Sequence, residues 1–66
     1  MNVTCEIVGG ERRDLELDPG ATYGDLLDAV GFSPREATAL VDGAPVPDDR
    51  PVDAEEVRVL RLIKGG

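Results

Sequence analysis

The residue types that perform most enzyme chemistry are scarce in this 66-residue chain. Histidine is absent and Cys5 is the sole cysteine, which excludes a histidine-activated nucleophile, an intrachain disulfide and a cysteine-based metal site. A candidate reactive group remains at the end, where the sequence reads "RVLRLIKGG". A terminal carboxylate has a pKa of about 3.3 to 3.7, so at pH 7 the carboxylate of Gly66 is an ionised nucleophile toward a phosphate.

Two glycines at the end suit that chemistry because glycine has no Cβ. The backbone of Gly65 and Gly66 can thread a narrow channel and adopt any φ, and it leaves the Gly66 carbonyl open to attack. The alternative is a frayed end without function. The fold pattern described below favours the reactive interpretation.

Three leucines are expected to form an apolar docking patch near this end. Strand alternation places Leu40 and Leu60 opposite the core residues, and Leu62 follows Leu60 on the same parity, so we expect these side chains to be exposed. The alternative is that they are scattered surface leucines, which are common in soluble proteins.

A basic cluster is expected beside the patch, on a body that is otherwise acidic. It comprises Arg58, Arg61 and Lys64. Such a cluster would steer the end toward an acidic groove or toward the nucleotide phosphates of a partner. The alternative is a solvated strand edge.

Other candidate residues are interpreted structurally. Cys5 lies on the inward parity between Val3 and Ile7, so we expect a buried, inert thiol. The acidic stretch 48–56 has a proline spacing that matches no calcium loop, and it is interpreted as a solvated surface. The sequence has no phosphate-binding loop. We therefore expect no bound metal or cofactor, and any ATP would be bound by a partner.

The charge balance narrows the class of partner. The net charge is −7 and the isoelectric point is near 4.2. A surface this negative repels phosphates, so direct binding of nucleic acid is not expected. The sequence also lacks a membrane-spanning run and a signal peptide, which predicts a cytoplasmic location. We also expect the protein to be a monomer. High salt should favour its folding, because counterions screen the self-repulsion of the acidic residues.

The first seventeen residues predict a β-hairpin with its apolar residues on one parity. A two-residue turn at Gly9-Gly10 would place charges on the core face. A three-residue loop over 9–11 avoids this, and we expect it with a glycine bulge. The expected pairs are Val3 with Leu17, Cys5 with Leu15, and Ile7 with Arg13.

A short helix follows, because the apolar period changes from two to that of a helix. Its apolar face comprises Tyr23, Leu26, Leu27 and Val30. Thr22 and Asp25 have the spacing of a capping box, and Gly31 fits the left-handed position that closes a helix.

Two further strands are expected after the helix. The first has Ala39 and Val41 on its inward parity and ends at a turn over Asp42-Gly43. An irregular, acidic and proline-bearing connection leads to the last strand, which begins at about Glu56 and turns Val57 and Val59 inward.

The helix must then cover one face of a mixed sheet, because only this arrangement buries both apolar surfaces. With the last strand central and parallel to the first, the topology is the β-grasp, an α+β fold in a single domain over 1–66. Residues 62–66 are expected to form a flexible, extended tail.

The chain resembles the ubiquitin-like proteins from "MNVTCEIV" through "LVDG" to "LRLIKGG". It is most similar to the small archaeal modifier proteins, and it also resembles the ubiquitin-related modifier and the sulfur carriers of thiamine and molybdopterin synthesis. The resemblance implies a carrier that is not itself an enzyme. An activating enzyme would use ATP to adenylate the Gly66 carboxylate.

Two fates of the adenylate are left open by the resemblance. The carboxyl group can be joined to target lysines by isopeptide bonds, or converted to a thiocarboxylate for tRNA thiolation or molybdopterin synthesis. The family also implies that the leucine patch receives the activating enzyme. Lys64 is the only lysine and hence the only possible lysine acceptor for chains. The alternative function is a non-covalent β-grasp interaction module whose Gly-Gly end is incidental.

Overall fold

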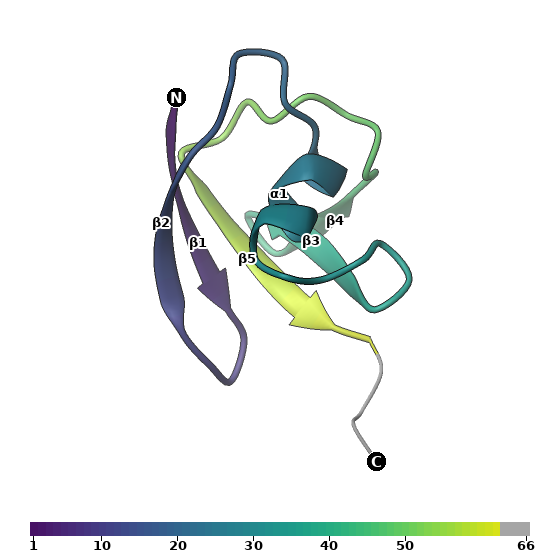
Figure 1. Cartoon of the computed structure of the whole chain (residues 1–66). Coiled ribbons are helices and arrows are strands. Elements are labelled where there is room, and N and C mark those ends of the chain that lie inside the picture. Colours follow the sequence, from purple (N-terminus) through teal and green to yellow (C-terminus); the bar gives the residue numbers. More distant parts are fainter. Residues whose placement is uncertain (63–66) are drawn as a thin grey trace.

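A single helix lies across one face of a mixed, five-stranded sheet in the computed structural model, which describes residues 1–62 (Figure 1). The strand order is β2-β1-β5-β3-β4. The elements are β1 (Asn2–Ile7), β2 (Arg12–Glu16), α1 (Tyr23–Ala29), β3 (Ala37–Val41), β4 (Ala44–Val46) and β5 (Glu56–Arg61). This is the layered arrangement predicted from the apolar pattern. Of the expected tail over 62–66, only Leu62 is among the described residues.

The last strand is central and parallel to the first, as predicted. Cys5 is paired with Val57 and Ile7 with Val59 across β1 and β5. On its other side β5 is antiparallel to β3, where Ala39 is paired with Val59. Strand β5 is therefore hydrogen-bonded along both edges.

The predicted register of the first hairpin is wrong by two residues. Val3 is paired with Leu15 and not with Leu17, while Cys5 is paired with Arg13. The loop has the expected three residues but spans 8–10, because the Ile7 amide bonds to the Glu11 carbonyl (2.8 Å). Gly9 takes the positive φ of 78° that a turn needs at this point. A shift of two preserves parity, so the predicted core face is correct.

Helix α1 begins and ends at the predicted residues. The Asp25 amide donates to the Thr22 hydroxyl (3.2 Å), and the Thr22 amide donates to the Asp25 carboxylate (3.0 Å), which completes the capping box. At the other end Gly31 has a φ of +88°, and its amide bonds to the Asp28 carbonyl. The next amide, of Phe32, reaches back to the Leu27 carbonyl (2.9 Å), which makes the helix end a Schellman motif.

Strand β4 was not predicted, because the turn over Asp42-Gly43 was expected to end the strand without a paired strand after it. Asp42 and Gly43 both have positive φ, 53° and 81°. Two such residues in succession characterise a type I′ hairpin turn, so the chain folds back and pairs with β3. Pro45 is tolerated because β4 is an edge strand.

The connection between β4 and β5 is irregular, as expected, but it also contributes to the core. Val52 is 6% exposed, and its amide bonds to the Ala21 carbonyl (2.8 Å). The Tyr23 hydroxyl donates to the Asp53 carboxylate (3.1 Å). These contacts fasten the connection to the start of α1.

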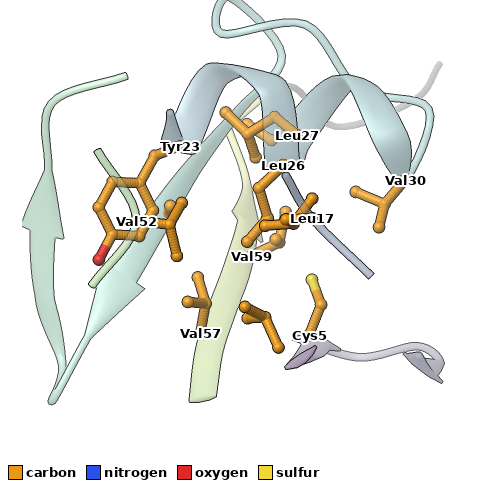
Figure 2. Packing of buried hydrophobic residues seen from close by; sticks show 12 residues of the cluster. Cys5, Leu17, Tyr23, Leu26, Leu27, Val30, Val52, Val57 and Val59 are labelled. Atoms are coloured by element: carbon orange, nitrogen blue, oxygen red, sulfur yellow. The ribbon is translucent and has the colours of Figure 1, made fainter. Parts of the chain in front are cut away.

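The core lies between α1 and the inward parity of the sheet (Figure 2). Tyr23, Leu26 and Leu27 of the helix face Val57 and Val59 of β5. The remaining buried members are Val3, Cys5, Leu17, Val30, Ala37, Ala39 and Val52. Within the described part of the chain, α1 is too short to cross a membrane.

Candidate functional site

Strand β5 leads directly to the proposed reactive end. Gly65, Gly66 and Lys64 themselves lie outside the described residues. Val57 and Val59 are 2% and 0% exposed, so their side chains anchor the strand in the core. The residues beyond Arg61 are therefore attached to one of the most firmly held elements of the fold.

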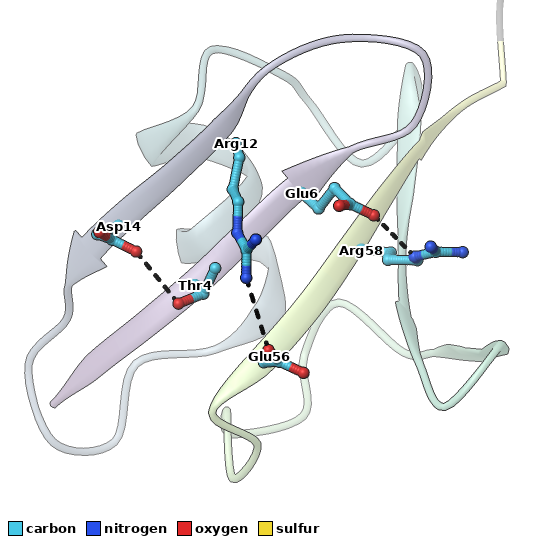
Figure 3. A network of polar contacts seen from close by, with 6 residues as sticks. All are labelled: Thr4, Glu6, Arg12, Asp14, Glu56 and Arg58. Carbon is cyan, nitrogen blue, oxygen red and sulfur yellow. Dashed lines mark hydrogen bonds and ion pairs between the residues drawn. The ribbon is translucent and has the colours of Figure 1, made fainter.

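A row of charged side chains crosses the sheet face that points away from α1 (Figure 3). Arg12, Glu6 and Arg58 are cross-strand neighbours on β2, β1 and β5. Arg58 forms an ion pair with Glu6 (3.0 Å). Arg12 reaches over β1 to Glu56 (3.7 Å). Both arginines are thus engaged with acidic residues of the same face.

Apolar side chains lie at the end of this face where β5 ends. Leu60 is opposite Thr38 of β3 and is 38% exposed, and Leu62 is 56% exposed. Val8 is 42% exposed, and it neighbours Leu60 because the preceding residues, Ile7 and Val59, are paired. We call Val8, Leu60 and Leu62 the exit patch.

Val8 is a patch residue that the sequence prediction missed. Its even number matches the parity of Leu60, and this signal was available. In the structure Val8 borders a surface hollow together with Glu6, Arg12 and Arg58.

The expectation that Leu40 is exposed is wrong, since this side chain is half-buried. Leu40 is paired with Arg58 on one side and with Pro45 on the other. The unpredicted strand β4 therefore flanks it. Leu40 lines a hollow of about 360 Å³ beside the charged row and lies diagonally from Leu60.

The expectation that Arg58 and Arg61 belong to one basic cluster is also wrong. Arg58 and Arg61 differ in parity, so they project from opposite faces of β5. Arg58 pairs with Glu6 on the outer face. The Arg61 guanidinium instead lies over the Phe32 ring, 5.8 Å from its centroid, on the side of α1. The parity of the two numbers already contained this information.

Cys5 is fully buried, as predicted. Burial raises the pKa of its thiol above the ordinary value, and the nearby charge of Arg13 lowers that pKa by a smaller amount. The thiol is therefore held in its protonated, unreactive form.

Comparison with known proteins shows which family the chain belongs to. The family model described as small archaeal modifier protein 2 matches residues 1–63. Small archaeal modifier protein 2 of Haloferax volcanii is 56% identical over the whole of both chains. An uncharacterised protein of Archaeoglobus fulgidus is 31% identical, again over the whole of both chains.

Solved structures agree with this relationship. The crystal structure of the H. volcanii protein superposes with a TM-score of 0.76, at 55% identity and 97% coverage of each chain. The solution structure of a protein designed on the template of human ubiquitin has a TM-score of 0.72 over 98% of this chain and 95% of its own. At 16% identity this second likeness shows the ubiquitin-like β-grasp fold alone. The chain therefore belongs to the small archaeal modifier protein 2 family.

Proposed function

We propose that this protein is a ubiquitin-like modifier whose reactive group is the carboxylate of Gly66. A carboxylate oxygen attacks the α-phosphorus of ATP in a partner enzyme, forms an acyl-adenylate and releases pyrophosphate. A target lysine amine then attacks the Gly66 carbonyl carbon, forms an isopeptide bond and releases AMP. The observation that carries the proposal is the match to a modifier over the full length of both chains.

The same adenylate supports a second use as a sulfur carrier. The terminal sulfur of a persulfide donor attacks the same carbonyl carbon and releases AMP, which gives an acyl disulfide. A second thiol of the donor then attacks the donor sulfur, so the donor leaves as a disulfide and the carrier as a thiocarboxylate. That sulfur would be passed to enzymes of tRNA thiolation or molybdopterin synthesis. Both uses need an activating enzyme that binds ATP, and neither needs a catalytic residue in this chain.

The docking surface for the activating enzyme is the exit patch, with Leu40 at its border. This patch supplies the apolar contact beside the strand that leads to Gly66, while Arg58 and Arg12 are paired with Glu6 and Glu56 of this chain. Of the expected basic cluster this leaves Lys64 to meet acidic groups or phosphates of the partner, because Arg61 lies over the Phe32 ring.

Polymer formation on the modifier itself should be restricted. Lys64 is the only lysine, and it lies two residues from the reactive Gly66. The Met1 ammonium group donates to the Leu17 carbonyl (2.9 Å) and pairs with Glu16 (3.3 Å), which disfavours it as an alternative acceptor. We expect little lysine-linked polymer, and an abundant branched peptide at Lys64 would contradict this.

Deletion of Gly66 tests the proposed function. The deleted protein should keep its fold and lose all covalent products in cells, because the carboxylate is displaced from its required place. Gly10→Ala is the matched control, since a Cβ there meets only ordinary contacts with Ile7 (3.6 Å). If the deletion leaves partner binding and every product unchanged, the protein is instead a non-covalent interaction module.

A further inference from the structure

The end of β5 is held on the helix side by the segment that follows α1. The Leu62 amide donates to the Glu36 carbonyl (2.7 Å), and Arg61 is paired with Ala37 of β3. The Arg61 guanidinium lies 5.8 Å from the centroid of the Phe32 ring. The last described residues of the chain are thus fixed by a backbone contact and a side-chain contact.

The position of Phe32 is set independently of Arg61. Phe32 directly follows Gly31, and its amide bond to the Leu27 carbonyl belongs to the Schellman motif. Its ring is half-buried and packs against the core. The position of the aromatic face is therefore set by contacts other than the one with Arg61.

Glu36 is held just as firmly. The Ser33 hydroxyl and amide both donate to the Glu36 carboxylate (3.1 Å and 3.4 Å). The Glu36 amide in turn bonds to the Ser33 carbonyl (2.9 Å). This closed turn presents the Glu36 carbonyl to Leu62.

A guanidinium over an aromatic ring is attracted by the negative face of the ring, and arginine stays charged at any working pH. Strand ends otherwise fray, because their outermost hydrogen bonds are exposed to water. The contact with Phe32 keeps Arg61 on the helix side, which leaves Leu60 and Leu62 on the outer face.

We propose that Phe32 is a positioning residue that fixes the direction in which the chain leaves β5. This inference rests on the proposed function, because it is the activating enzyme that gains from a chain end presented in a narrow range of directions. A preorganised end loses less conformational freedom on binding, so the contact lowers KM and leaves the chemical step alone.

Phe32→Leu and Phe32→Tyr separate the stacking contact from simple packing. Leucine preserves the apolar contact with the core but has no aromatic face, whereas tyrosine retains the face. With the cognate activating enzyme, ATP–pyrophosphate exchange should show a KM raised roughly two- to fivefold for Phe32→Leu at unchanged kcat. Phe32→Tyr should match the original protein.

Arg61→Gln completes a double-mutant cycle. It should raise KM by a similar factor alone and add nothing in the Phe32→Leu background, because the two residues act through one contact. Additive effects, or a kcat effect without a KM effect, would overturn the proposal.

A measurement without the enzyme keeps the inference separate from the proposed function. Nitrogen-15 relaxation should show a lower order parameter for the Leu62 amide in Phe32→Leu than in Phe32→Tyr, at equal thermal stability. Equal order parameters in both variants would overturn the positioning role. If the order parameter falls but the original protein is never adenylated, positioning stands and the proposed function fails.

Discussion

Single residues on β5 have separate tasks because the strand alternates faces. Val57 and Val59 turn inward and are buried, whereas Leu60 turns outward and is exposed. Arg61 returns to the helix side and meets Phe32. Within "RVLRL", Val59 therefore packs in the core, Leu60 belongs to the exit patch, and Arg61 contacts Phe32.

Leu60→Asp should weaken recognition by the activating enzyme without unfolding the protein. The side chain is 38% exposed and lies on the central strand, so the free energy of unfolding should fall by about 1 kcal/mol and the protein should still fold. A charge in the centre of an apolar contact should raise KM roughly tenfold. Leu60→Met is the control and should behave normally. Undiminished adenylation of a folded Leu60→Asp protein would remove the exit patch from the account.

Cys5 should make the protein less stable in alkali. Burial raises the pKa of its thiol above the ordinary value of 9.0, and the pKa of the Tyr23 phenol is raised as well, mainly by burial. The folded state therefore holds these protons more tightly than the unfolded state. Their contribution to stability is complete below the unfolded pKa and is lost as pH rises through the folded pKa.

Urea unfolding between pH 7 and 11 measures this effect. The free energy of unfolding should decline above about pH 9, and Cys5→Ala should decline less steeply although it starts lower because of the small cavity. The folded protein should also react slowly with a thiol reagent at pH 8. Reaction as fast as that of a free cysteine would show that the thiol is accessible.

At the scale of elements, the helix depends on its ends. Helix α1 has seven residues, which is too short to be stable alone in water. Its stability comes from the buried face of Tyr23, Leu26 and Leu27, and from the capping box and Schellman motif at its termini. The Schellman motif at the end of α1 also sets the position of Phe32, whose ring contacts Arg61 at the end of β5.

Thr22→Ala should destabilise the protein by about 1 kcal/mol, since it removes the hydroxyl that accepts from the Asp25 amide. Thr22→Ser keeps that hydroxyl and should cost clearly less. Urea denaturation of the two variants provides the comparison. Equal stability of Thr22→Ala and the original protein would show that the capping box contributes nothing.

The elements also show how far the sequence could be interpreted. The helix and its caps were predicted because their signals are local: a 3.6-residue period, Thr22, Asp25 and Gly31. The hairpin register was missed because parity is preserved by a shift of two, and the choice depends on which residue near Gly9 takes a positive φ. Strand β4 was missed because Pro45 argues against a strand unless its place at the sheet edge is known.

At the scale of the whole molecule, acidic charge dominates. Fourteen acidic residues stand against seven basic ones. The ion pairs of the outer face are largely exposed, and exposed pairs contribute little each. Folding therefore brings like charges together without strong compensation.

The melting temperature should rise with added KCl. Most of the rise should occur below about 1 M KCl, because at about 1 M the Debye screening length has already fallen to about 3 Å. Sucrose at matched osmolarity is the control, because it stabilises by exclusion and does not screen charge. A melting temperature indifferent to KCl would contradict this interpretation of the charge.

The site was less predictable than the fold for a reason visible in Leu40 and Arg61. Leu40 is half-buried because β4 flanks it, and Arg61 meets a ring that is distant in sequence. Both facts depend on tertiary neighbours. Gly65 and Gly66 could be proposed from the sequence alone, because the chemistry proposed for them requires only a terminal carboxylate without neighbouring side chains.

Mass spectrometry of cells that naturally make the protein shows whether Gly66 is joined to other proteins. Trypsin cuts after Lys64, so conjugation must leave Gly65-Gly66 as a remnant on lysines of target proteins. We expect such remnants on other proteins, and their loss when Gly66 is deleted. Sulfur carriage would add a free pool with one oxygen of the Gly66 carboxylate replaced by sulfur. A digest without remnants, together with an intact mass showing only the unmodified carboxylate, would contradict the account.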